Sequence, residues 1–142
     1  MIKAKLLAAA FCFAATATAA IAAPSTFRCD LNSGQAKGWV APEVIIQYDT
    51  GTGAAKVLDG IIYQTNGSAI PAQLAQKGNQ VVLVWTVLVE DSRGQDTHMR
   101  YTGRHVPETN RISVLAQPDG RFEGRFRATG RCQVTDRRYE GF

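Results

Sequence analysis

The segment Gln80-Val-Val-Leu-Val-Trp-Thr-Val-Leu-Val-Glu90 is the strongest indication of fold class in this chain. Between its polar ends only Thr86 is not apolar, and most of the apolar residues are valine. Valine is β-branched, and its stiff side chain favours an extended backbone over a helix. A helix that crosses a membrane needs about 20 residues, so this segment is too short to be one. It therefore predicts a long central β-strand.

Residues 1–22 have the features of a secretory signal peptide. Lys3 and Lys5 precede an apolar run from Leu6 to Ala15, and Ala20-Ile-Ala22 forms an A-x-A cleavage site. We therefore expect residues 1–22 to be removed. The mature protein would then be periplasmic or secreted, with no transmembrane segment.

The mature chain is expected to form one domain, 23–135, followed by a flexible tail, 136–142. Removing Lys3 and Lys5 from the 16 basic residues leaves 14 against 12 acidic ones, a net charge of +2. This modest charge makes nucleic acid a poor candidate partner for an exported protein. The arginines are concentrated in the last third of the chain, from Arg93 onward, and we interpret them as a solvated face.

Two cysteines, Cys29 and Cys132, remain near the ends of the mature chain. An oxidising compartment and an even cysteine count make a disulfide between them the expected state. The alternatives are two free thiols or a metal pair, but neither cysteine has a neighbouring histidine or second cysteine. By chain entropy, closing a loop of this length would contribute about 4–5 kcal/mol to stability.

Alternation of apolar and polar residues predicts seven or eight short strands. The last of them, Arg121–Val134, has the clearest pattern, with phenylalanine, alanine, glycine and Cys132 on one face and arginines on the other. Its inner glycines suit a strand that another backbone approaches closely. The other predicted strands are Ser25–Asn32, Val44–Asp49, Ala54–Leu58, Ile61–Gln64, Gln80–Glu90, Asp96–Arg104 and Arg111–Gln117.

The segment Ala69–Lys77 fits two structures. Pro71 near its start and Gly78 just after its end suit a short helix. Its predicted neighbours are all strands, however, and Lys77-Gly-Asn79 could form a hairpin turn into the central strand. We favour a strand here.

Short strands separated by turn signals, with no convincing helix, predict an all-β barrel or sandwich. Cys29 and Cys132 both share a face with apolar residues, on the first and the last predicted strand. A bond between them would join the two ends of the sheet, as closure of a barrel requires. We therefore predict a small antiparallel meander β-barrel of seven or eight strands, closed by an end-to-end disulfide.

Few residues qualify for a catalytic or metal site. His98 and His105 are the only histidines, and at seven positions apart on one strand they fall on opposite faces. The adjacent acids Glu90-Asp91 also point apart. The segment Gly51–Lys56 lacks the spacing of a phosphate-binding loop and is interpreted as a hairpin turn. We predict no catalytic residue, no metal site and no cofactor.

The central strand is apolar on both faces. Trp85 belongs to the face expected in the core, whereas Val82, Val84 and Leu88 occupy the second face. A contiguous exposed apolar patch commonly marks a contact site, so we expect something to cover these three residues. Either Ala69–Lys77 or the tail folds over them, or they form a surface for a homodimer or a protein partner.

These features predict an exported, non-enzymatic β-barrel binding protein whose target is a protein partner or a small apolar ligand. The alternative is a hydrolase or isomerase whose site is distributed over loops at the barrel rim. An open interior lined by small residues would support a small ligand, whereas a filled one would leave the outer surface for a protein. Histidine and acid side chains converging at one rim would support the enzyme. No motif assigns the chain to a family.

Overall fold

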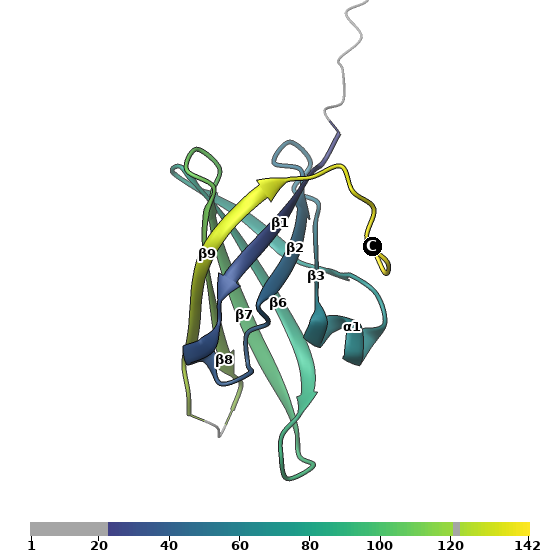
Figure 1. Cartoon of the computed structure of the whole chain (residues 1–142), viewed down its shortest axis with the longest axis vertical. Coiled ribbons are helices and arrows are strands. Elements are labelled where there is room, and N and C mark those ends of the chain that lie inside the picture. The colour runs from purple at the N-terminus through teal and green to yellow at the C-terminus, as the bar shows by residue number, and fades with distance from the viewer. Residues whose placement is uncertain (1–22, 121–122) are drawn as a thin grey trace, which may run out of the picture.

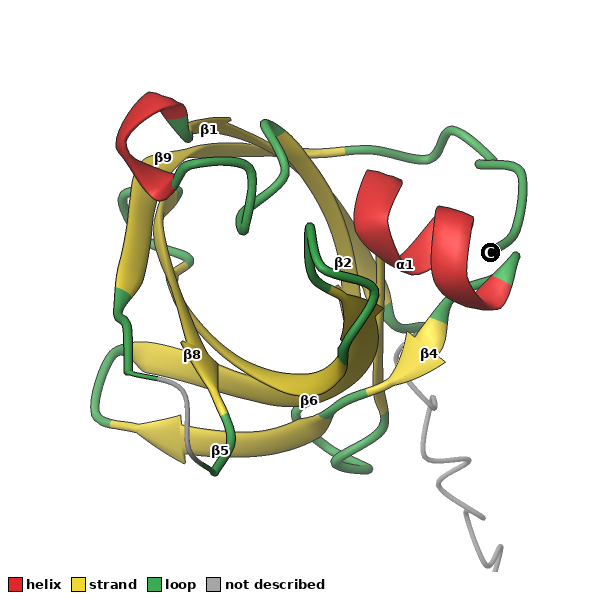
Figure 2. Cartoon of the chain, turned by 90° about the horizontal axis from the view of Figure 1, so that it is seen from below, coloured by secondary structure: helices red, strands yellow, loops and turns green. Residues whose placement is uncertain are grey.

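The computed structural model describes residues 23–120 and 123–142, so the expected signal peptide lies outside the described residues. The chain forms a nine-stranded antiparallel sheet that rolls into a nearly closed barrel (Figures 1 and 2). Prediction and structure thus agree on a β-barrel, although the strand number exceeds the predicted seven or eight. The strands are β1 (Ser25–Asn32), β2 (Glu43–Tyr48), β3 (Ala55–Asp59), β4 (Ile70–Pro71), β5 (Gln73–Lys77), β6 (Gln80–Glu90), β7 (Asp96–Val106), β8 (Arg111–Pro118) and β9 (Phe126–Val134).

The first and last strands of the chain pair inside the sheet, and strands from the middle of the chain form its two free edges. Its order is β4-β3-β2-β1-β9-β8-β7-β6-β5, so β1 and β9 are direct neighbours and the free edges belong to β4 and β5. Only Ala72 separates these two edge strands. The chain therefore crosses from β3 to β6 within one segment, and Ala72 donates its N–H to the carbonyl of Ala55 at 3.0 Å. Ala69–Lys77 is mainly extended, as we favoured.

A short helix, α1 (Gly60–Asn66), replaces the strand predicted over Ile61–Gln64. The carboxylate of Asp59 accepts a hydrogen bond from the N–H of Ile62 at 2.8 Å and so caps the first turn. Gly67, with φ 75°, ends the helix. Asp59 and Gly67 thus cap the two ends of this helix. The helix packs against β3 and β6, the strands that pair with the two edge strands, and buries Ile62 completely.

A second, shorter helical turn, η1 (Gly34–Ala36), follows β1. No helix in the described part of the chain is long and apolar enough to cross a membrane.

Large side chains fill the interior of the barrel. Trp85 is 3 % exposed, as predicted for the inner face of β6, and stacks on Tyr101 with ring centroids 5.4 Å apart. Gly103 leaves room for the indole, because a Cβ at this position would lie 3.1 Å from the ring. The other fully buried large side chains include Val44, Ile46, Val57, Leu83, Val87, Met99, His105 and Val114. The interior is therefore a packed core.

The predicted disulfide joins Cys29 on β1 to Cys132 on β9, and both residues are buried. The two cysteines lie directly opposite each other in the ladder that pairs these strands. Near them, a Cβ on Gly130 would overlap the carbonyl oxygen of Asp30. The close approach of another backbone, predicted for an inner glycine of the last strand, is confirmed at Gly130. The disulfide thus reinforces a seam that strand pairing already closes.

Candidate functional site

The outer faces of β7, β8 and β9 form one surface that carries many of the arginines. Alternate residues of neighbouring antiparallel strands share a face, and residues opposite each other in the register form rows across it. Three adjacent rows run across the strands in the order β7, β8, β9. They are Thr102–Leu115–Arg127, Arg104–Ser113–Thr129 and Val106–Arg111–Arg131.

We call this surface the arginine wall and define it by Arg100, Arg104, Arg111, Arg127 and Arg131, all of which are exposed. Among the described residues, ion pairs are made only by Arg28, which lies on β1. Arg131 has an acid opposite it in the register, Asp30, but that carboxylate lies 3.1 Å from Arg28. The arginine wall therefore carries several positive charges that no described acid neutralises by direct contact.

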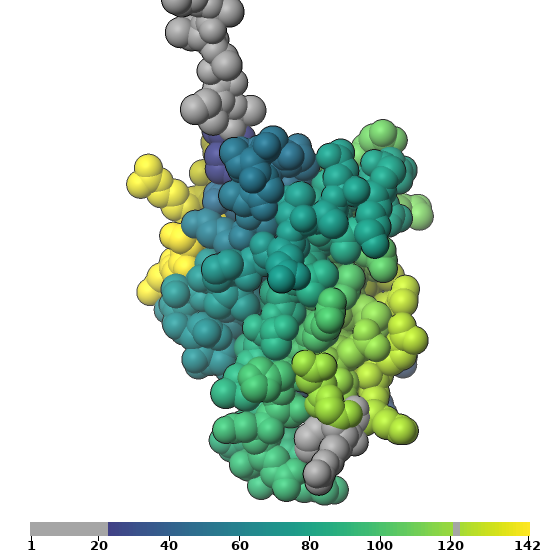
Figure 3. Space-filling model, turned by 180° about the vertical axis from the view of Figure 1, so that it is seen from behind, coloured from purple at the N-terminus to yellow at the C-terminus, as the bar shows by residue number. Residues whose placement is uncertain are grey.

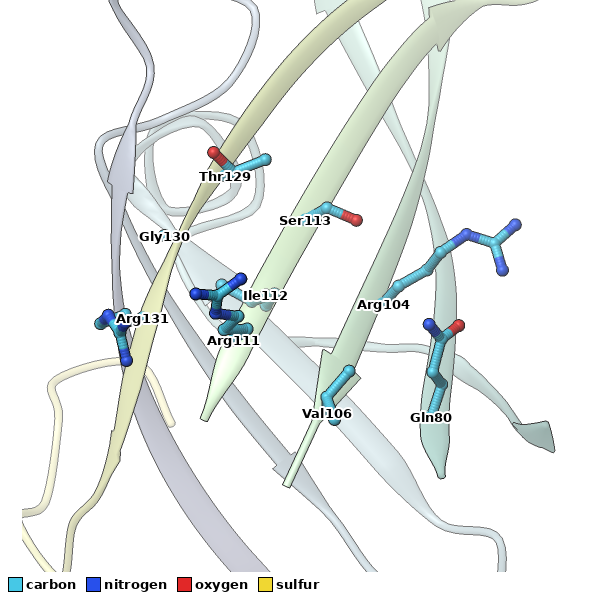
Figure 4. A pocket seen from close by; sticks show the side chains of 9 residues that line it. All are labelled: Gln80, Arg104, Val106, Arg111, Ile112, Ser113, Thr129, Gly130 and Arg131. Atoms are coloured by element: carbon cyan, nitrogen blue, oxygen red, sulfur yellow. The ribbon is translucent and has the colours of Figure 1, made fainter. Parts of the chain in front are cut away.

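An open depression of about 450 Å³ lies in the arginine wall (Figure 4). Arg111 and Arg131 lie directly opposite each other at one side of it, and Ser113 and Thr129 form the next pair along the same two strands. In Figure 4, Arg104 extends on the other side of the depression, toward the side of Gln80. The lining residues are Gln80, Arg104, Val106, Arg111, Ile112, Ser113, Thr129, Gly130 and Arg131. Its side chains offer guanidinium, hydroxyl and amide groups and include no carboxylate.

The residues predicted to form a contact surface for a partner lie on the outer face of β6, beside the arginine wall. Val82 is buried, Val84 is half-buried and Leu88 is 49 % exposed. Val82 lies opposite Arg104 in the register, and Leu88 lies opposite His98. Strand β5, which belongs to the first segment expected to cover β6, pairs with β6 along its edge. The C-terminal tail, the other expected cover, lies at the far edge of this side of the molecule in Figure 3. Neither segment that we expected to cover this strand lies across Leu88.

The outer face of β1–β3 differs from the arginine wall, and we call it the covered wall. Helix α1 and the tail lie beside it in Figure 1. Tyr63 of the helix and Tyr139 of the tail line a hollow above Ile45 and Leu58. Both of these apolar residues are buried although they lie on the outside of the barrel. On this side, the chain covers its own outward apolar residues.

On the covered wall, Arg28 is paired with two acids. The Nε atom of Arg28 lies 2.6 Å from Oε2 of Glu43, and this hydrogen bond raises the pKa of Arg28. Its Nη2 atom lies 3.1 Å from Oδ1 of Asp30. One arginine thus binds two carboxylates.

The two histidines lie on opposite faces of β7, as predicted. His98 is exposed, whereas His105 is fully buried in the barrel. Its Nδ1 atom lies 2.9 Å from the hydroxyl of Tyr48, its Nε2 atom has no hydrogen-bond partner among the described residues, and the ring meets Phe27 edge-on. Burial lowers the pKa of His105 to about 4. The imidazole is therefore neutral at pH 7 and links β7 to β2 across the core.

The acids that sequence reasoning considered lie at the far end of β6. Glu90 lies opposite Asp96 where β6 and β7 meet their turn, and Asp91 accepts backbone hydrogen bonds from Arg93 and Gln95 within that turn. Gly51 lies in the turn between β2 and β3 and donates its N–H to the carboxylate of Asp49. The described residues contain no group of three or more His, Cys, Asp or Glu that could hold a metal ion.

The depression was not identified from the sequence. Alternation places Thr129 and Arg131 on one face of the last strand, and this signal was available. Their neighbours Ser113 and Arg111 come from another strand, and only the register between the strands brings the four together. We interpreted the arginines as an ordinary solvated face because a one-strand pattern cannot show that they line a hollow.

Comparison with known proteins adds no family or neighbour to these observations. No family model, no curated protein and no solved structure matches the chain.

Proposed function

We propose that this chain is an exported, non-enzymatic β-barrel that binds a protein partner through its arginine wall. The observation that carries the proposal is the group of exposed arginines on the wall, none of which forms an ion pair with a described acid, beside the apolar residues of β6. Export is expected from residues 1–22, and a buried disulfide fits an oxidising compartment.

The packed interior supports a partner outside the barrel over a small apolar ligand within it. Ligand-binding barrels keep a cavity, commonly of 300–1,000 Å³, that buries most of the ligand. Here the inner positions of the strands hold Trp85, Tyr101, Met99 and His105, each almost fully buried. A small apolar ligand would have to displace these side chains.

The arginine wall has the chemistry of a protein-binding surface. Arginine is enriched at interfaces because its planar guanidinium forms paired hydrogen bonds with carboxylates. Leu88 and Val84 add apolar surface at the border of the wall, where water can be excluded. The partner that fits has an acidic surface with an apolar margin.

A second copy of this chain is a poor partner for the same surface. A two-fold dimer brings the same patch of both subunits together. Across the arginine wall, that arrangement would place arginines against arginines. We therefore propose a different protein as the partner and regard a homodimer as the less favourable occupant.

Native mass spectrometry of the protein purified from the periplasm tests the proposal. The variant Arg104→Glu/Arg111→Glu/Arg131→Glu reverses the charge of the wall, and Lys56→Glu/Arg137→Glu/Arg138→Glu makes the same change in net charge elsewhere. We expect the wild type and the second variant to retain one acidic protein that the first variant loses.

Three results would contradict the proposal. They are a partner retained by both variants, a partner lost equally from both, or a retained molecule of low mass in place of a protein.

A further inference from the structure

The depression in the arginine wall has features that identify the chemistry of its occupant. We infer that it is a carboxylate-binding subsite for an acidic, extended segment of the partner, and this inference rests on the proposed function. The segment would place one side-chain carboxylate between Arg111 and Arg131, with Ser113 and Thr129 beside it.

The pairing of Arg111 with Arg131 is the first argument. Residues directly opposite each other on antiparallel strands have Cα atoms about 4.5–5.5 Å apart, and like charges in this arrangement repel. The nearest acid in the register, Asp30, is already bound to Arg28. A carboxylate between the two guanidinium groups would remove the repulsion and gain charge-assisted hydrogen bonds from both.

The hydroxyls of the next row are the second argument. Ser113 and Thr129 lie directly opposite each other, two residues along from Arg111 and Arg131 on the same outer face. Each hydroxyl can donate one hydrogen bond to an oxyanion. Val106 adds apolar surface to the lining, and none of the described residues that line the depression has a carboxylate that could compete for the bound acid.

The repeat of hydrogen-bond donors along the outer face of β9 favours a peptide over a small free anion. Arg127, Thr129 and Arg131 alternate along the outer face of this strand. Alternate side chains of a strand lie about 6.8 Å apart, and those of an extended peptide repeat at the same distance. A bound acidic strand would therefore present its alternate carboxylates, those on the side that faces the barrel, to Arg131, Thr129 and Arg127. A single phosphate or sulfate would occupy only one of these positions.

An NMR titration with a hexaglutamate peptide tests the inference on the full mature chain labelled with ¹⁵N. We expect saturable shifts of the Arg111 and Arg131 side-chain Nε–Hε signals and of the Ser113 and Thr129 amides. The double variant Arg111→Gln/Arg131→Gln should weaken peptide binding at least about tenfold, since charge-assisted hydrogen bonds are about twice as strong as neutral ones. Ser113→Ala should weaken it about threefold, the loss expected for one net hydrogen bond.

Arg100→Gln is the matched control, because this exposed arginine lies on the same wall but does not line the depression. Its effect should stay below about twofold. An equal loss from Arg100→Gln and Arg111→Gln would show diffuse attraction and overturn the subsite. Saturation of the same signals by inorganic phosphate at equal or lower concentration would also overturn it, because the depression would then select phosphate. The dispersion of the amide spectrum reports whether each variant is folded.

Native mass spectrometry separates failure of the subsite from failure of the proposed function. If hexaglutamate does not bind the depression while partner retention still depends on the wall, the subsite is wrong and the proposed function stands. If the retained partner is indifferent to charge reversal of the wall, the proposed function fails and the inference fails with it.

Discussion

The two sides of this barrel share one core but have different outer faces. On the covered wall, α1 and the tail lie over the outward apolar residues Ile45 and Leu58, and Arg28 binds two carboxylates. On the arginine wall, Arg104, Arg111 and Arg131 form no ion pair with any acid in the described part of the chain, and Leu88 of the neighbouring strand is half exposed.

The difference shows on which side the chain covers its own outward apolar residues. A surface whose outward apolar groups are already covered has little apolar area left to bury against another molecule. A surface that leaves arginines unpaired beside apolar side chains can gain both ion pairs and buried area. We therefore propose that a partner binds at β6–β9 and not at β1–β3. The following changes test how the two walls are joined and whether they differ as described.

Removing the covalent link between the walls should have the largest effect. Cys29→Ala/Cys132→Ala opens a loop with a sequence separation of 103 residues, and the expected loss of stability is about 4–5 kcal/mol. Because the β1–β9 ladder remains, the barrel should still form, with a lower melting temperature but protected amides in β1 and β9. Two thiols that alkylate in the folded, oxidised wild type would contradict the link.

Crowding the seam should have the next largest effect. Gly130→Ala places a methyl group against the Asp30 carbonyl, so β1 and β9 must separate, with an expected cost of about 3 kcal/mol or more in chemical denaturation. Gly60→Ala is the control, because a Cβ at the start of α1 meets no atom within 4 Å. Equal stability of the two variants would show that the walls do not touch closely at Gly130.

Protonating the core contact between the walls should have a smaller effect that depends on pH. His105 joins β7 to Tyr48 of β2, and its pKa of about 4 lies below the ordinary 6.5. The unfolded chain therefore binds the proton first, and stability should fall as the pH drops from 6.5 to 4, by roughly 2–3 kcal/mol from this group. Below pH 4 the loss from His105 should level off.

Urea denaturation at several pH values measures this loss. His105→Gln should flatten the slope between pH 6.5 and 4. The same slope in the wild type and in His105→Gln would mean that other groups cause the pH dependence.

Much of the fold follows from local patterns in the sequence. The apolar run of β6, the alternation of β9 and the two inward cysteines are enough to predict a β-barrel joined at its first and last strands. Two segments differ from their predictions. Asp59 can mark either a turn or a helix N-cap. Ala69–Lys77 has the pattern of a single strand, but it divides at Ala72 into β4 and β5, which lie at opposite edges of the sheet.

The candidate site is less predictable because it depends on register. The pair Arg111 and Arg131 forms only after β8 and β9 align, and no local pattern fixes the offset between two strands. The sequence does show arginines on one face of the last strand. It does not show that the neighbouring strand adds another arginine and a serine, or that the described residues lining the depression include no acid.

Single neutralisations should have the smallest effects on stability, and their signs should differ between the walls. Arg111→Gln removes repulsion from Arg131 and should slightly raise the melting temperature. Arg28→Gln breaks contacts with Glu43 and Asp30 and should slightly lower it. Differential scanning calorimetry at low salt measures both shifts, which should shrink in 1 M salt. Shifts of the same sign would remove the electrostatic difference between the walls.

Arginine footprinting tests most directly which wall binds the partner. Phenylglyoxal labels exposed guanidinium groups, and peptide mass spectrometry then measures labelling at each arginine with and without the partner fraction purified from the periplasm. The two-wall account predicts that Arg104, Arg111 and Arg131 lose most of their labelling in the complex, whereas Arg137 and Arg138 of the tail keep theirs. Protection of Arg137 and Arg138 with the wall still labelled would contradict it.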